Sequence, residues 1–185
     1  MATHQHATID DLHREEGKAE LVGGEIVRMS PAGRKHGRVS LRIARRLLEH
    51  QESTSAAGEA FADSVGFLCD LAHRQSFSPD AAYYAGPDSD EDKFLPQAPE
   101  FAVEIRSEED EDYGPKAEQR LSDKRSDYFT AGTKVVWDVD LKGEDVVRVY
   151  RAADPENPTI YRRGDVAEAE PAVRGWTMPV DELFR

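Results

Sequence analysis

Two stretches decide the fold of this chain: Ser78-Pro79-Asp80-Ala81-Ala82-Tyr83, and Phe101-Ala102-Val103-Glu104-Ile105-Arg106-Ser107. The first enters a strand through a Pro-Asp pair. The second is apolar enough for an inner strand but carries a carboxylate in its middle. Two acids on neighbouring inner strands repel each other and lose hydration, so a bound group is expected to compensate them. A divalent metal ion is the simplest such group, because hard cations take carboxylate oxygens.

The length of 185 residues is enough for one domain with a genuine core. We expect residues 1–17 to form a tail or short helix and residues 18–185 to fold as a single domain. No apolar run approaches the roughly 20 residues of a membrane span, and the N-terminus lacks a signal-peptide pattern. The sequence therefore predicts a cytoplasmic protein without a membrane partner. The single cysteine, Cys69, excludes an internal disulfide and a Cys-based zinc cluster.

The net charge of -13 argues against a non-specific nucleic-acid binder, which usually carries a basic footprint. Residues 34–46 are the exception, because they hold six Lys or Arg and no acid. Two interpretations of this segment stay open, a solvated amphipathic helix or a helix face that follows phosphates. The candidate nucleic-acid contacts share one helical face: Arg38, Arg42, Arg45 and Arg46.

Hydrophobic periodicity predicts the remaining elements. Gly23-Gly24 between two alternating runs predicts a hairpin over residues 19–29, and apolar residues four apart predict a helix over residues 34–52. A proline in its first turn and a glycine after its end frame a second helix over residues 115–131. Strands are expected at residues 59–63, 64–71, 75–84, 100–106, 134–140 and 145–151, with the strand over 75–84 carrying Asp80.

Alternation along a strand places Glu104 and Arg106 on the same face. If the Asp80 strand is its neighbour, Asp80 and Glu104 can converge on one ion, with the Ile105 carbonyl as a further oxygen ligand. Such a site would hold Mg²⁺ or Mn²⁺ together with water and a substrate phosphate. Arg106 stays protonated and cannot be a general base, although it could clamp a phosphate. Lys124, on the following helix, is the better candidate for the lysine that assists an attacking water.

The ordered set of these segments resembles the Uma2 family, a domain of unknown function within the PD-(D/E)xK nuclease superfamily. The resemblance rests on Pro79-Asp80, Glu104 to Ser107, Lys124 to Gly132 and Val136 to Asp140, and on an opening similar to Glu20 to Ile26, Ser30-Pro31 and His36-Gly37. It implies a restriction-endonuclease-like α/β (α+β) core: a mixed central sheet flanked by helices, with an N-terminal hairpin. It also implies a divalent-metal site for DNA cleavage.

Carried over residue by residue, the resemblance assigns Asp80 and Glu104 as metal-binding carboxylates and Lys124 as the lysine moved onto the next helix. Arg106 stands where the usual lysine of the superfamily would be. Glu20 matches an acid of the opening hairpin and His36 a further family position. The possible accessory residues are Glu20, His36, Arg106 and Tyr128.

Three functions follow as alternatives. The first is a Mg²⁺-dependent DNA endonuclease, for which a homodimer is expected because cutting both strands favours two sites. The second is a nucleic-acid-binding or regulatory module on the same fold that cuts little or nothing, which the acidic surface and Arg106 favour. The third is a metal-dependent hydrolase of a small phosphorylated substrate. Serine-histidine-aspartate catalysis has no support, because no serine lies in a glycine-flanked elbow.

Overall fold

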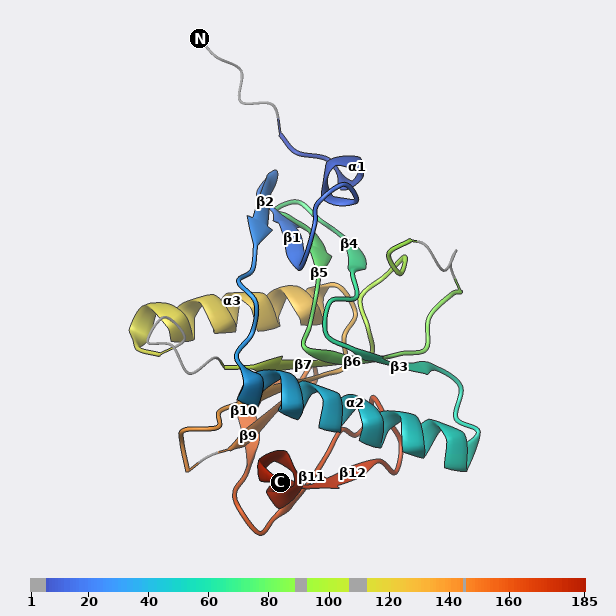
Figure 1. Ribbon diagram of the computed structural model, residues 1–185, viewed down its shortest axis with the longest axis vertical. Coiled ribbons are helices and arrows are strands. Elements are labelled where there is room, and N and C mark those ends of the chain that lie inside the picture. The colour runs from blue at the N-terminus through green and yellow to red at the C-terminus, as the bar shows by residue number, and fades with distance from the viewer. Residues whose placement is uncertain (1–5, 89–92, 107–112, 145) are drawn as a thin grey trace.

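A mixed six-stranded sheet forms the centre of the molecule. The computed structural model describes residues 6–88, 93–106, 113–144 and 146–185. In spatial order the strands of this sheet are β10 (Asp154–Tyr161), β9 (Val147–Arg151), β8 (Val135–Val139), β7 (Phe101–Ile105), β6 (Ala81–Tyr84) and β3 (Glu59–Ala62). Neighbouring strands are antiparallel except β7 and β8, which are parallel. The expected mixed sheet with flanking helices is confirmed (Figure 1).

Helix α3 (Pro115–Thr130) covers one face of this sheet because it is the crossover between the parallel strands β7 and β8. Its first position is Pro115, where the missing N–H costs no hydrogen bond. Tyr128 is fully buried under α3 and stacks on Phe77, with ring centroids 4.1 Å apart. The crossover therefore brings α3 over the face of β7 that carries Glu104.

Helix α2 (Arg34–Thr54) covers the opposite face. Its side chains Val39, Ile43 and Leu47, four residues apart, are fully buried in the core cluster that also contains Val103. The stripe agrees with the helical period read from the sequence. A second cluster, on the α3 side, contains Tyr128. The central sheet thus has a separate hydrophobic layer on each face.

A smaller four-stranded sheet lies on the same side as α3 (Figure 1). Its order is β2 (Glu25–Arg28), β1 (Ala19–Val22), β5 (Arg74–Phe77) and β4 (Phe67–Leu71). Gly23 and Gly24 join β1 to β2 with φ of 62° and 77°, values that favour glycine. The predicted N-terminal hairpin is confirmed, and the short helix α1 (Ile9–Leu12) precedes it.

The prediction of one strand over residues 75–84 is wrong. Strand β5 ends at Phe77, and β6 begins at Ala81 in the other sheet. The Ser78 N–H donates to the Glu20 carboxylate at 2.9 Å instead of to a strand, and Pro79 has no N–H to donate. Asp80 therefore lies at the junction of the two sheets, directly before β6.

The C-terminal segment packs against the central sheet on the α2 side. It contains the ribbon β11 (Val166–Glu168) and β12 (Thr177–Pro179), followed by the 3₁₀ helix η2 (Val180–Phe184). Trp176 and Leu183 are buried in the core and Phe184 packs on its edge, as expected from the sequence. The ribbon itself was not predicted. Of the two acidic runs, residues 89–92 and 108–112 lie outside the described residues, and no described helix has the length and apolarity to cross a membrane.

Candidate active site

The carboxylates of Asp80 and Glu104 lie on the same face of neighbouring strands. Strands β6 and β7 pair with Ala81 opposite Val103, so the register places Asp80 opposite Glu104. The Asp80 N–H donates to the Val103 carbonyl at 2.9 Å, which continues the pairing one residue beyond β6. Side chains alternate along a strand, so both acids face the side covered by α3 and the smaller sheet. The expected adjacency of the two acidic segments is confirmed by this register.

Asp80 is buried and engages groups from three segments of the chain: Lys18, helix α2 and strand β7. Its Oδ2 accepts the Ile105 N–H at 2.7 Å and lies 3.1 Å from His36 Nε2. Its Oδ1 accepts from Lys18 Nζ at 2.5 Å, and Lys18 also lies 2.6 Å from Asp63. Burial alone would raise the pKa of Asp80, but His36 and Lys18 outweigh it and hold that pKa well below its usual range. The carboxylate is therefore ionised.

Glu104 contacts two residues of α3 spaced one turn apart. The Tyr128 hydroxyl donates to Glu104 Oε1 at 2.7 Å, and Lys124 Nζ lies 2.9 Å and 3.0 Å from the two carboxylate oxygens. Burial raises the pKa of Glu104, and the charges of Asp80 and Glu20 raise it further, against the opposing effect of Lys124. Burial is thus the main reason that the pKa of Glu104 is raised, and the neighbouring carboxylates add to it.

Lys124 also joins Glu104 to Glu20. Its Nζ lies 2.9 Å from Glu20 Oε1, while Arg74 Nη1 donates to Glu20 Oε2 at 2.6 Å. Arg74 in turn donates to Asp127 at 2.7 Å, which ties α3 to β5. Burial lowers the pKa of Lys124, but Glu104 and Glu20 outweigh it and raise that pKa above the ordinary value. Lys124 is therefore an ammonium and cannot serve as a general base.

Arg106 lies in a separate buried network, away from these carboxylates. Its Nε and Nη2 donate to the two oxygens of Asp138 at 2.8 Å and 2.7 Å, and its Nη1 and Nη2 also donate to Glu118. The Asp138 hydrogen bond, the Glu118 hydrogen bond and the charges of both acids together raise the pKa of Arg106 against the effect of burial. Arg106 thus joins the end of β7 to β8 and α3, and Asp138 and Glu118 engage its donors.

Three of the four arginines expected to contact phosphates have partners within the chain. Arg42 donates to the Leu183 carbonyl at 3.0 Å, and Arg45 pairs with Glu49 at 2.9 Å. Arg46 lies 3.4 Å from both Glu49 and Glu182. Arg38, nearer to His36, is exposed. Of the expected phosphate contacts, the exposed Arg38 lies nearest in sequence to the site.

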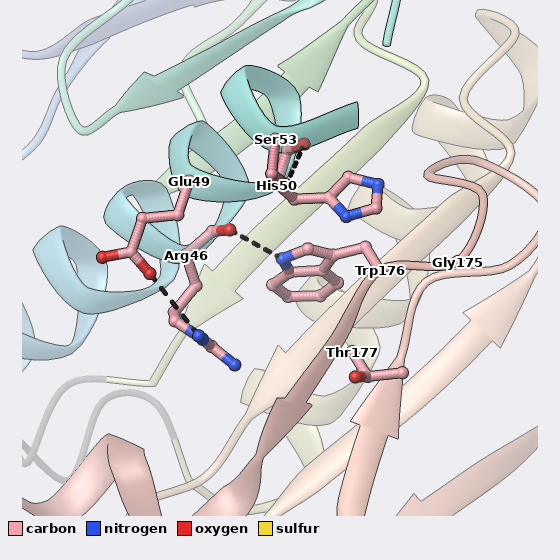
Figure 2. A pocket seen from close by; sticks show the side chains of 7 residues that line it. All are labelled: Arg46, Glu49, His50, Ser53, Gly175, Trp176 and Thr177. Atoms are coloured by element: carbon pink, nitrogen blue, oxygen red, sulfur yellow. Dashed lines mark hydrogen bonds and ion pairs between the residues drawn. The ribbon is translucent and has the colours of Figure 1, made fainter. Parts of the chain in front are cut away.

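Neither of the two cavities found in the described residues coincides with the acids. The cavity in Figure 2, of about 210 Å³, lies between the C-terminal half of α2 and residues 175–177. Trp176 closes it and donates through its indole N–H to the Arg46 carbonyl at 3.1 Å (Figure 2). A second cavity, of about 410 Å³, lies beside β4. The carboxylates of Asp80 and Glu104 lie apart from both cavities, at the junction of the two sheets.

The donor set suits a hard divalent cation. Asp80 and Glu104 supply ionisable oxygens and Ile105 a backbone carbonyl, the ligand types that Mg²⁺ and Mn²⁺ take. Among the described residues, the group of three or more side chains at metal-ligand spacing is His36, Asp63 and Asp80, so Glu104 stands outside that group. A bound cation would oppose the burial and the charges of Asp80 and Glu20, which raise the pKa of Glu104.

Two residues of the site were missed in the sequence. Lys18 contacts both Asp63 and Asp80, and neither Lys18 nor Asp63 belongs to a motif. Lys18 stands two residues before Glu20, and this spacing places two side chains on one face of an extended segment. The sequence could therefore have predicted that Lys18 lies on the same side as Glu20. Asp63 directly follows β3 and gives no comparable signal.

Comparisons with known proteins agree with this architecture. A family model described as "Uma2: Putative restriction endonuclease" matches residues 6–181. The crystal structure of "a putative nuclease belonging to DUF820" from Anabaena variabilis ATCC 29413 superposes with a TM-score of 0.73 at 16% identity, over 96% of this chain and 97% of that one. No curated protein matches the sequence. The family model spans nearly the whole chain, and this protein belongs to the Uma2 family.

Proposed function

We propose that the protein is a metal-dependent endonuclease that hydrolyses phosphodiester bonds in DNA. The observation that carries the proposal is the pairing of Asp80 and Glu104 in register across β6 and β7, with Lys124 held on Glu104. The nuclease fold and the family are consistent with it. Two carboxylates, a carbonyl and an ammonium are together the groups that phosphodiester hydrolysis by a metal-bound water requires.

Asp80, Glu104 and the carbonyl of Ile105 would hold Mg²⁺ or Mn²⁺. When bound, the metal lowers the pKa of a ligated water and offsets negative charge on the phosphate. The Ile105 N–H and His36 fix the orientation of the Asp80 carboxylate, because both engage its Oδ2 while Lys18 donates to its Oδ1.

Lys124 acts in this account as a permanent ammonium. Its pKa is raised, so it donates hydrogen bonds and stabilises negative charge but does not remove a proton from water. Glu20 holds the Lys124 ammonium at 2.9 Å, and the Tyr128 hydroxyl holds the Glu104 carboxylate at 2.7 Å. Arg38 at the exposed start of the basic helix would contact the DNA backbone, and the wider acidic surface would confine binding to this side.

The test is nicking of supercoiled plasmid DNA in Mg²⁺ or Mn²⁺ by the wild-type protein and by Asp80→Asn. The variant keeps the shape of the side chain but removes its charge, so nicking should fall by at least about 100-fold. Asp70→Asn is the matched control, because Asp70 is an exposed acid of β4. Equal nicking by wild type and Asp80→Asn, or nicking that survives chelation of the metal, would contradict the proposal.

A second candidate is a DNA-binding module that does not cleave. The observation in its favour is that Asp138 and Glu118 hold the donors of Arg106, so this residue does not assist cleavage. A gel-shift assay read beside the nicking assay separates the two. Retarded DNA that stays intact in Mn²⁺ would favour the module.

A further inference from the structure

Lys18 places its ammonium between two carboxylates at the junction of the sheets. Nζ lies 2.5 Å from Asp80 Oδ1 and 2.6 Å from Asp63 Oδ1, and the side chain is only 14% exposed. His36 Nε2 lies 3.1 Å from the other oxygen of Asp80. Ligand atoms of His36, Asp63 and Asp80 all lie within 4.8 Å of one another. The ammonium therefore occupies a group of side chains spaced as metal ligands are.

We propose that the ammonium of Lys18 takes the place of a second metal ion. The inference rests on the proposed function, which puts one divalent ion at Asp80 and Glu104. Two-metal phosphodiesterases share a carboxylate between ions about 3.5–4 Å apart. Asp80 would hold that shared position here, because Lys18 lies on its Oδ1, His36 lies on its Oδ2, and Glu104 lies opposite it on β7. The site would then work with one metal ion and one built-in cation.

The charges around Lys18 are consistent with this role. An ammonium is a compact point charge with three donors, and two of its partners here are ionisable carboxylates at 2.5–2.6 Å. Without a cation, Asp63 and Asp80 would be two like charges in a mainly buried setting, which costs free energy. A second divalent ion would satisfy the same carboxylates, so the ammonium and the ion compete for one position.

The backbone holds Lys18 at this position. The Met29 N–H donates to the Lys18 carbonyl at 2.9 Å, and β1 begins at the next residue and pairs with β2. Ala19 is buried in the cluster beneath the hairpin. The ammonium is thus fixed by the fold and is not a freely moving surface charge.

Calorimetric titration of Mn²⁺ into the full chain counts the ions directly. Wild type should bind about one Mn²⁺ per chain, and Lys18→Met should bind about two, because the methionine removes the competing charge. Lys18→Arg keeps a cation at the position and should again bind about one. Lys116→Met is the matched control, since it removes an exposed lysine on α3 and should leave the count at one. Asp63→Asn in the Lys18→Met background should remove the second binding event.

Each outcome decides the inference. Two ions on wild type, or a folded Lys18→Met protein that binds no more ions than wild type, would overturn it. If Lys18→Met does not fold, the counts for wild type and Lys18→Arg still decide, since two ions on either would contradict a built-in cation. Failure of the proposed function looks different: wild type would bind no ion and nick no DNA, while Lys18→Met would still gain an Asp63-dependent ion over wild type.

Discussion

Lys124 Nζ, on the crossover helix α3, lies 2.9 Å and 3.0 Å from the two carboxylate oxygens of Glu104 on β7. Tyr128, one turn further along α3, donates to the same carboxylate. The contact links an acid of an inner strand to the helix that the parallel β7–β8 pair requires. The position of the lysine is therefore a consequence of the topology, and Arg106 is left to serve a different network.

Removing this ammonium should suppress cleavage. We expect Lys124→Met to lower the rate of plasmid nicking by about 100-fold or more, because a positive charge beside the phosphate is lost. Glu20 and Glu104 would also lose their shared counter-charge, so the free energy of unfolding should fall by about 3 kcal/mol. Chemical denaturation and single-turnover nicking measure the two effects. A Lys124→Met protein that nicks at the wild-type rate would show that this ammonium has no role in the reaction.

We expect loss of the Tyr128 hydroxyl to affect the orientation of Glu104 more than the packing of the core. Tyr128→Phe keeps the ring stacked on Phe77 but removes the donor to Glu104, so we expect a loss of about 1 kcal/mol in stability and a clear fall in nicking. Tyr83→Phe is the matched control, because its hydroxyl donates to the Ala57 carbonyl at 2.8 Å and not to the site. Equal nicking by the two variants would count against orientation of Glu104 by Tyr128.

Arg106 should prove structural. Arg106→Met leaves Asp138 buried with only Arg125, at 3.4 Å, so the free energy of unfolding should fall by about 3–5 kcal/mol. The double variant Arg106→Met/Asp138→Leu removes both charges and should recover much of that loss. Mn²⁺ affinity of the folded double variant should equal that of wild type. A large loss of metal affinity in the double variant would instead place Arg106 in the metal site.

Acid should weaken the fold through Asp140, among other carboxylates. Burial raises its pKa, but the N–H groups of Lys142 and Gly143 and the Tyr113 hydroxyl outweigh it, so the pKa in the folded state is lowered. A lowered folded-state pKa contributes stability above the unfolded value of about 3.9, and that contribution is lost as the pH falls further through the folded value. Denaturation curves between about pH 6 and pH 3 should therefore show a shallower loss for Asp140→Asn than for wild type. Parallel curves would contradict this assignment.

Local sequence patterns predicted much of the fold and one half of the site. The Gly23-Gly24 turn and the stripe of Val39, Ile43 and Leu47 specify their elements through short-range chemistry. Lys124 and Tyr128 are four residues apart on one helix, so their common direction toward Glu104 could be expected.

The other half depends on contacts between distant segments. Residues 75–84 have a continuous strand-like pattern. The strand is interrupted because the Ser78 N–H donates to the Glu20 carboxylate, on β1 of the smaller sheet, and not to a neighbouring strand. The partners Lys18 and Asp63 come from two elements that no local pattern joins. Arg106 was a candidate accessory residue that could clamp a phosphate, because the sequence alone does not show that Asp138 is its buried partner on β8.

The most direct test of the metal site is the anomalous difference map of a crystal soaked in Mn²⁺. The account predicts a peak about 2.0–2.6 Å from carboxylate oxygens of both Asp80 and Glu104, with the Ile105 carbonyl as a further ligand. It also predicts that Lys18 remains on Asp63. A map without a peak at Asp80 and Glu104, or a peak held by His36 and Asp63 with Lys18 displaced, would contradict it.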